Sequence, residues 1–268
     1  MDIHPLDVLH LTCVRGGGCC HAKQIAVTPW EIARLARATG LSAAQARDDL
    51  TTAGGTRLLT DGPDDGRGHA ACRLLGAQGC SVHADRPLAC RLFPLGRNLS
   101  EGRAVYHMPA QHRCADLCPE VLAQPRRRVG EWLQQQDVAD GEVAHDAYGR
   151  LVCALLSHAG QLAEGEEFAS ELRLRAALDP GRRAALLPRP WFELATAPDL
   201  PELVHDPATF VLAHAERIFG AAVAGFAGAP PRAALVLATV ALQLGEPLGI
   251  PAPAAVAHAL AARQAAVA

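Results

Sequence analysis

"LTCVRGGGCC", residues 11–20, places three of the chain's nine cysteines (Cys13, Cys19 and Cys20) close together, with three glycines between them. Glycine adopts positive φ angles and lets the backbone approach a neighbouring group closely. The stretch therefore predicts a loop that wraps around whatever its thiols hold. Buried apolar thiols, disulfide halves and metal ligands are the three explanations that the rest of the sequence must separate.

The composition is that of a globular protein. The chain has 268 residues, of which 50% are hydrophobic and 20% charged, and its net charge is -3. This charge gives no reason to expect nucleic acid or an anionic membrane as a partner. The N-terminus lacks the basic region of a signal peptide, and no apolar run reaches the roughly 18 residues that cross a bilayer. We expect a cytoplasmic protein whose protein or small-molecule partner is unknown.

Stable disulfides are disfavoured in the cytoplasm, so clustered cysteines there indicate metal binding or redox chemistry. All but one of the nine precede residue 120, in three groups: Cys13 with Cys19 and Cys20; Cys72 with Cys80 and Cys90; and Cys114 with Cys118. A structural zinc site or an iron–sulfur cluster takes about four such ligands. The chain therefore has either two sites or several cysteines that do not ligate. The spacings match neither the paired C-x2-C of zinc ribbons nor the bacterial ferredoxin run.

Local signals predict short helices in the first half. Thr28 and Glu31 form a capping box, and Gly40 ends the helix that follows. A second capping box, Ser42 with Gln45, opens another helix. Residues 54–69 are rich in glycine and aspartate and predict an exposed loop, and the segment 73–83 predicts a small hairpin around a Gly76–Gly79 turn.

Helical periodicity dominates the second half of the chain. Apolar residues recur at helical spacing in six segments: 126–136, 146–163, 166–178, 208–228, 231–245 and 253–267. A proline-rich joint covers residues 186–207. We predict a mostly α fold, with an irregular cysteine-rich metal-binding domain with short helices at 1–123 and an all-α helical module at 124–268. Cys153 is expected to be a small buried hydrophobe, and Trp30, Trp132 and Trp191 are expected to anchor the packing.

The segment "GCSVHADRPLACRLFP", residues 79–94, carries a more specific pattern. It contains Cys80, Arg86–Pro87, Cys90–Arg91 and Phe93–Pro94. With the first cysteine group and the "TPWEIARLA" segment, it resembles the YkgJ-type cysteine-cluster family, described as zinc- or iron-chelating domains with a CxxCxxCC signature. The resemblance covers residues 11–118. The chain departs from it at Gly16, where the signature has a cysteine, and at His83, where the family usually has tyrosine.

The resemblance implies a cysteine-ligated metal centre. We expect a [4Fe–4S] cluster with a role in redox or cluster chemistry, with zinc as the alternative. Cys19, Cys20, Cys80 and Cys90 are the first ligand candidates, Cys13 and Cys72 come next, and Cys114 with Cys118 can compensate for the missing thiol. A distant similarity to flagellin lysine N-methylases implies a second reading, a cluster-dependent modifying enzyme such as a protein lysine methyltransferase. The third is a zinc-stapled protein-interaction module.

Two arginines flank Cys90 in the segment 79–94. Arg86 and Arg91 are expected to offset the negative charge of a thiolate-ligated cluster and to donate to its sulfur atoms. The alternative is that they bind Asp85 or helix C-terminal carbonyls. Three histidines near the cysteines are more typical of solvent-facing residues than of ligands: His21, His107 and His112.

Overall fold

The structure is a computed structural model that describes residues 2–14, 17–21, 23–100, 103–108, 118–226 and 228–267. The chain forms two compact units. The cysteine unit comprises Met1–Ile25 and Leu59–Glu142, and the helical unit comprises Ala26–Leu58 and Val143–Ala268. Helices dominate, with short elements in the N-terminal region, which confirms the predicted fold class. The predicted domain boundary between residues 123 and 124 stays a prediction.

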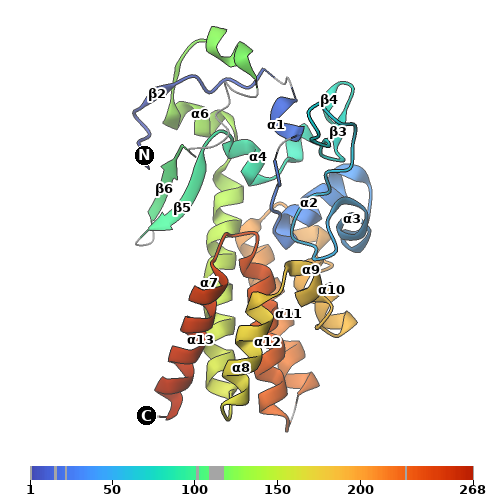
Figure 1. The fold of residues 1–268 in the computed structure, drawn as a ribbon, viewed down its shortest axis with the longest axis vertical. Coiled ribbons are helices and arrows are strands. Elements are labelled where there is room, and N and C mark those ends of the chain that lie inside the picture. Colours follow the sequence, from blue (N-terminus) through green and yellow to red (C-terminus); the bar gives the residue numbers. More distant parts are fainter. Residues whose placement is uncertain are drawn as a thin grey trace. The chain divides into compact units, whose positions relative to one another are not determined.

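The cysteine unit consists of short elements joined by loops (Figure 1). Its strands are β1 (Asp2–Ile3), β2 (Val8–Leu9), β3 (Leu75–Gly76), β4 (Gly79–Cys80), β5 (Gly96–Ser100), β6 (Arg103–His107) and β7 (Arg127–Arg128). Its helices are α1 (Gly18–His21), α4 (Leu88–Leu92) and α6 (Val129–Gln135), with 3-10 turns η1 (His83–Asp85) and η2 (Pro119–Ala123). Antiparallel pairings of these described strands give three sheets, β1-β6-β5, β2-β7 and β3-β4. The β3-β4 pair confirms the predicted hairpin, with Gly76 opposite Gly79.

A small apolar core holds the cysteine unit together. Its buried members are Ile3, Leu11, Leu88, Leu92, Leu95, Tyr106, Val129, Trp132, Leu133 and Val138. Leu88 and Leu92 are four residues apart on α4, so both face this core from the same side of the helix. The core therefore fixes the orientation of α4, which carries Cys90.

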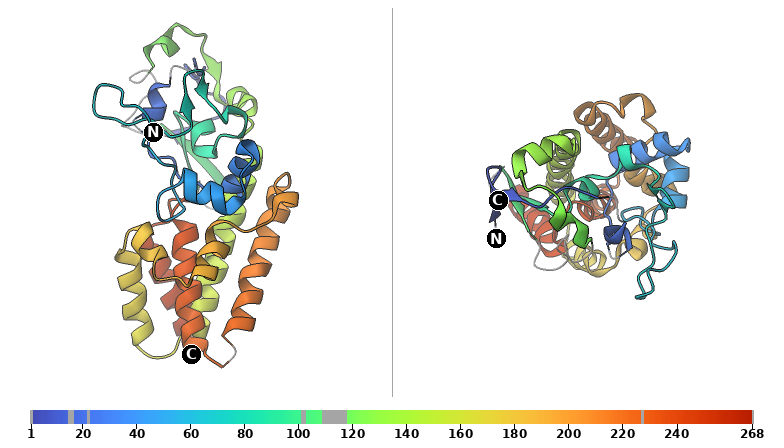
Figure 2. Two further views of the ribbon diagram at one scale, coloured as in Figure 1. Left: turned by 90° about the vertical axis from the view of Figure 1, so that its right-hand side faces the viewer. Right: turned by 90° about the horizontal axis from the view of Figure 1, so that it is seen from above.

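The helical unit contains α2 (Pro29–Thr39), α3 (Ala43–Leu50), most of α7 (Ala139–Leu162), α8 (Glu167–Ala177), α9 (Pro180–Ala184), α10 (Arg189–Thr196), the 3-10 turn η3 (Pro201–Leu203), α11 (Pro207–Gly225), α12 (Pro230–Gly245) and α13 (Ala252–Val267). Helix α12 packs against α8, α9, α10 and α13 (Figure 2). Its residues Leu237, Ala238 and Val240 are fully buried, because α12 has almost no polar side chain to present to solvent. Within the described ranges, no helix has both the length and the apolar character to cross a membrane.

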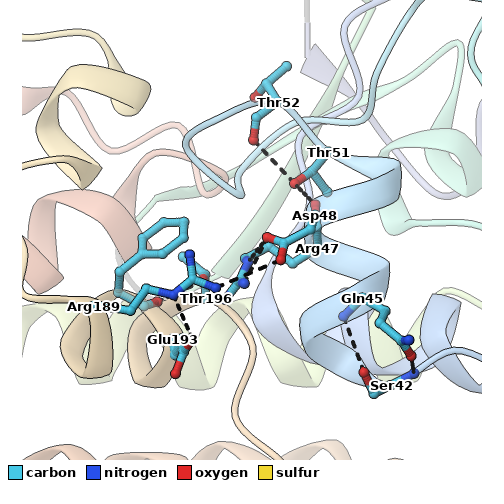
Figure 3. Close-up of polar contacts among 10 residues, drawn as sticks. Ser42, Gln45, Arg47, Asp48, Thr51, Thr52, Arg189, Glu193 and Thr196 are labelled. Atoms are coloured by element: carbon cyan, nitrogen blue, oxygen red, sulfur yellow. Dashed lines mark hydrogen bonds and ion pairs between the residues drawn. The ribbon is translucent and has the colours of Figure 1, made fainter.

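The predicted capping boxes are confirmed. The Thr28 backbone N–H donates to Glu31 Oε2 at 2.7 Å, and the Glu31 N–H donates to Thr28 Oγ1. Gly40 ends α2 with φ of 72° in the left-handed region. Ser42 and Gln45 repeat the reciprocal bonds at the start of α3 (Figure 3). These local bonds explain why two short helices form here.

Charged side chains link α3 to α10 within the helical unit (Figure 3). Arg47 donates from Nε to Asp48 at 2.7 Å, and its guanidinium lies 4.8 Å from the ring centroid of Phe192. Arg189 bonds to Glu193 at 2.6 Å and reaches Asp48 at 3.9 Å. The aromatic face and the carboxylate together stabilise a guanidinium that is buried.

A polar chain crosses the apolar core of the helical unit. His214 is fully buried, with Nε2 2.7 Å from the Leu194 carbonyl and Nδ1 3.0 Å from the Tyr148 hydroxyl. A carbonyl can only accept a hydrogen bond, so Nε2 carries the proton and Tyr148 donates to Nδ1. Burial, with a smaller contribution from the charge of Arg217, lowers the pKa of His214 to about 4, and the bond to the Leu194 carbonyl opposes this decrease. The imidazole is therefore neutral at physiological pH.

Two expectations about single side chains have different outcomes. The tryptophans are buried, which confirms that they anchor the packing: Trp30, Trp132 and Trp191. The prediction for Cys153 is wrong, because this thiol is exposed on α7. Leu151, Val152 and Leu155 form the buried face of that helix, and Cys153 lies outside that stripe.

Candidate metal centre

All the cysteines of the first half belong to the cysteine unit. The structure describes seven of them: Cys13, Cys19, Cys20, Cys72, Cys80, Cys90 and Cys118. Cys114, which was also predicted as a ligand, lies outside the described residues, as does His112. Cys19, Cys20, Cys72, Cys80, Cys90 and Cys118 are free thiols rather than halves of disulfides.

Within the glycine run, Gly17 turns the backbone just before Cys19 and Cys20, while Gly18 begins α1 and Gly16 lies outside the described residues. Gly17 has φ of 76°, a conformation that favours glycine, and its carbonyl accepts the Cys20 N–H at 2.8 Å. The resulting turn begins α1, which carries Cys19 and Cys20. The backbone N–H groups of Gly18 and Cys19 donate to Cys118 Sγ, which opposes the pKa increase that burial causes at this thiol. Cys118 is thus held against the start of α1, although about 100 residues separate them in sequence.

The hairpin group is tied to the first group through the backbone. The Cys72 N–H donates to the Cys20 carbonyl at 2.8 Å. Burial raises the pKa of both Cys72 and Cys80, while the N–H groups of Leu74 and Val82 donate to the respective sulfur atoms. Backbone N–H donors aimed at sulfur stabilise a thiolate, as they do in proteins that bind metals through cysteine.

Cys90 completes the group from α4. Its pKa rises to about 12, because burial disfavours the thiolate, and the neighbouring thiols Cys72, Cys80 and Cys19 add to the increase. The positive charge of Lys23 acts in the opposite direction. Such a thiol ionises readily only when a positive centre compensates for its charge.

Cys19 and Cys20 form the most strongly polarised pair. The Cys20 thiol donates a hydrogen bond to Cys19, which lowers the pKa of Cys19 to about 6 and raises the pKa of Cys20 far above its usual value. Lys23 and His21 lower the pKa of Cys19 further. Within this adjacent pair, Cys19 is therefore the thiol that ionises first.

The charge interactions show which thiols converge. Cys19, Cys80 and Cys90 each lie close enough for their charges to act on one another. Cys72 acts on Cys90 and is acted on by Cys80, and Cys20 is influenced by Cys90 and Cys72. Cys13 and Cys118 lie at the edge of the group, since Cys118 interacts with Cys19 and Cys13. Segments far apart in the sequence thus bring their sulfur atoms to one region.

The convergence does not produce the spacing of a single-ion site. In the part of the chain that the structure describes, no three His, Cys, Asp or Glu side chains are arranged to hold one metal ion. A zinc ion with Zn–S distances of about 2.3 Å would require thiolates about 4 Å from one another. The donor set nevertheless fits an iron–sulfur centre in its chemistry, because it is rich in thiols, half-buried and supplied with N–H donors. Which cysteines ligate stays a prediction.

The two predicted arginines occupy different positions. Arg91 is buried and donates to the carbonyls of Arg86 at 3.0 Å, Gln136 at 2.7 Å and Ala84, so it fixes the loop that precedes α4. Gln136 caps the C-terminus of α6, so the bond from Arg91 to its carbonyl matches the alternative expectation, in which the arginines bind helix C-terminal carbonyls. Arg86 bonds to the His83 carbonyl and to the Gln136 side chain, and its charge lowers the pKa of Cys80. Arg86 is therefore the arginine whose charge acts on a described thiol.

Sequence reasoning missed one functional candidate, Lys23. Its ammonium donates to the Ala89 carbonyl at 2.8 Å, and its charge acts on Cys19 and Cys90. The available signal was its position three residues after Cys20, as the only lysine of the chain. The histidine nearest to the thiols in sequence, His21, has Nδ1 3.2 Å from the Gly17 carbonyl, which places that nitrogen in α1 rather than toward a ligand.

The comparison with protein families agrees with this geometry. Residues 12–119 match the CxxCxxCC family model, described as "Putative zinc- or iron-chelating domain". This segment is thus similar to the CxxCxxCC domains. The match confirms the resemblance in the sequence and supports metal binding through the cysteines, with zinc or iron as the metal. Neither the search of curated proteins nor the search of solved structures gives a match.

Proposed function

We propose that the CxxCxxCC domain binds a [4Fe–4S] cluster through cysteine thiolates and that the protein acts in cytoplasmic redox or cluster chemistry. The observation that supports this is the mutual interaction of Cys19, Cys80 and Cys90, which come from three separate segments. An iron–sulfur cluster supplies one-electron transfer, at a potential set by net charge, hydrogen bonds to sulfur and solvent exposure.

The ligand set follows from these interactions. Cys19, Cys80 and Cys90 are proposed as three of the ligands, and Cys20 or Cys72 as the fourth. Adjacent side chains point in different directions, so Cys19 and Cys20 need not bind the same iron atom. Cys13, Cys114 and Cys118 are reserve ligands in this proposal, because the described members of this set lie at the edge of the group.

The residues around the thiols prepare them for a positive centre. The N–H groups of Leu74 and Val82 stabilise charge on two sulfur atoms, and Arg86 offsets charge at Cys80. Burial opposes ionisation of Cys90 in the absence of a cation. The domain should therefore bind its metal with release of protons, and binding should weaken as the pH falls.

Anaerobic purification, an absorption spectrum and a count of iron, sulfide and zinc test the proposal. We expect a brown protein with iron and sulfide in equal amounts, which Cys90→Ala abolishes. The control is Cys153→Ala, which removes an exposed thiol from the helical unit. A colourless, iron-free protein with stoichiometric zinc would refute the cluster and favour the zinc-stapled module.

The modifying-enzyme alternative makes a separate prediction. Calorimetry with S-adenosylmethionine on the anaerobic protein should show binding if the domain supports methyl transfer. Binding would replace the electron-transfer role with a catalytic one, whereas no heat of binding would leave the redox proposal in place.

A further inference from the structure

Lys23 joins the two thiol-bearing segments at the centre of the proposed site. Its backbone follows Cys20 by three residues, while its Nζ donates to the Ala89 carbonyl, next to Cys90, at 2.8 Å. Ala89 is the second residue of the five-residue helix α4, directly before Cys90. The ammonium is thus held against the helix that carries Cys90.

An aromatic ring fixes the same ammonium from a second direction. Nζ lies 4.2 Å from the centroid of the Phe93 ring, within the range of a cation–π interaction. Lys23 is half-buried, so this contact and the carbonyl replace part of the water that an exposed lysine would bind. The charge therefore has a defined place rather than the freedom of a surface lysine.

The position of the charge matters for the thiols on both sides. The charge of Lys23 lies close enough to act on Cys19 on one segment and on Cys90 on the other. Arg86 acts on Cys80, so each of the three mutually interacting thiols has a cation near it. The chain has 25 basic Lys and Arg residues, and the one lysine among them is at this position. An ammonium is a compact charge that fits between a carbonyl and a ring, whereas a guanidinium is planar and wider.

We infer that Lys23 is a charge-compensating and positioning residue of the metal centre, which holds the Cys19 and Cys90 segments together and stabilises the negative charge of their ligated thiolates. This inference rests on the proposed function and adds to it a residue that is not a ligand. The loss of this cation should loosen the bound cluster, and it should lower the reduction potential, because reduction adds negative charge.

Three variants test the inference on the anaerobic, cluster-loaded protein. Lys23→Met keeps most of the aliphatic stem and removes the charge, and Lys23→Arg restores a charge. Arg67→Met removes a cation from the exposed loop of the same unit as the matched control. We expect Lys23→Met to lose iron to a chelator about tenfold faster than the wild type, as is typical for residues that support metal ligands. Its potential should be lower, and Lys23→Arg should recover part of both properties.

Chemical acetylation covers the case in which Lys23→Met does not fold. Lys23 is the only lysine, so acetylation of the loaded wild type neutralises one side-chain ammonium after folding, and mass spectrometry locates it. Faster iron loss and a lower potential support the inference in either experiment. Equal behaviour of Lys23→Met and Arg67→Met overturns the inference and leaves the proposed function intact. Equal loss in Lys23→Met and Lys23→Arg, with no change in potential, also overturns it. A wild type that binds no metal refutes the proposed function and the inference together.

Discussion

The buried His214 makes the helical unit sensitive to acid. In the folded protein its pKa is about 4, because burial disfavours the imidazolium, whereas the unfolded chain has the ordinary value of 6.5. Between these two pH values the unfolded chain binds a proton that the folded chain does not, so stability falls as the pH falls. Above pH 6.5 both states are neutral, and His214 makes no contribution to the pH dependence.

The size of this effect follows from the two pKa values. One pKa unit corresponds to about 1.4 kcal/mol, so the full difference is about 3 kcal/mol. From these two pKa values, proton linkage predicts that the free energy of unfolding falls by about 2 kcal/mol between neutral pH and pH 5, and by about 3 kcal/mol between neutral pH and pH 4. An effect of this size is a large part of the total stability of a typical domain, about 5–15 kcal/mol.

Urea unfolding between pH 7 and pH 4, followed by circular dichroism, measures the loss. Other groups also titrate in this range, so the informative quantity is the difference between the wild type and His214→Gln. The amide of glutamine can still donate to the Leu194 carbonyl but does not titrate. The variant should be less stable than the wild type at pH 7, and the two free energies of unfolding should converge by about 3 kcal/mol at pH 4. Parallel pH profiles would refute the assignment of a neutral, buried imidazole.

Three further predictions concern helix packing, the thiols and the arginine scaffold. Gly160→Ala on α7 should destabilise by about 1–3 kcal/mol, because the new Cβ would clash with the backbone oxygen of Ala259 on α13. Gly149→Ala on the same helix meets open space and should stabilise by up to about 1 kcal/mol. Thermal unfolding that ranks the two variants the other way would contradict this packing. In the metal-free protein, Cys20→Ala removes the thiol that donates to Cys19, so the pKa of Cys19 should rise from about 6 toward its ordinary value. Alkylation of Cys19 at pH 7, measured by mass spectrometry, should therefore be slower than in the wild type. Arg91→Lys should lower the free energy of unfolding of the cysteine unit by about 1–3 kcal/mol, because one ammonium cannot reach the three carbonyls that Arg91 binds. Urea unfolding that shows wild-type stability for this variant would mean that the three bonds are not needed.

Local signals in the sequence predict the elements that depend on near neighbours. The capping boxes at Thr28 and Ser42 and the hairpin at Gly76 form as expected, because their hydrogen bonds span only a few residues. Helix α7 begins at residue 139 rather than 146, ahead of the apolar stretch that indicated it. The apolar pattern marks the face that packs and carries little information about a polar first turn.

Features that depend on contacts between residues far apart in the sequence cannot be predicted from these local signals. Strand β1 pairs with β6, so that Asp2 lies opposite His107. A strand of two residues is too short to carry a sequence pattern that predicts its pairing partner. The apolar neighbours of Cys153 predict a buried thiol, but a helix buries only one stripe of residues, and Cys153 lies outside that stripe. Lys23 escaped notice because its role depends on the Ala89 carbonyl, which lies 66 residues further along the chain.

The spacing of the sulfur atoms bears directly on the choice between zinc and iron. A four-coordinate zinc ion draws its thiolates into contact distance, and a site built for it would place at least three ligands around one point. The described thiols Cys19, Cys80 and Cys90 interact through their charges, and among the described residues no group of three side chains has single-ion spacing. An [Fe–S] cluster is larger than an ion and holds each thiolate on a different iron atom, so its ligands stand further apart. With the proposed cluster in place, compensating cations would matter at several segments, because a multi-iron anion distributes its charge toward each of its ligands. Lys23 and Arg86 lie next to the segments that would receive that charge.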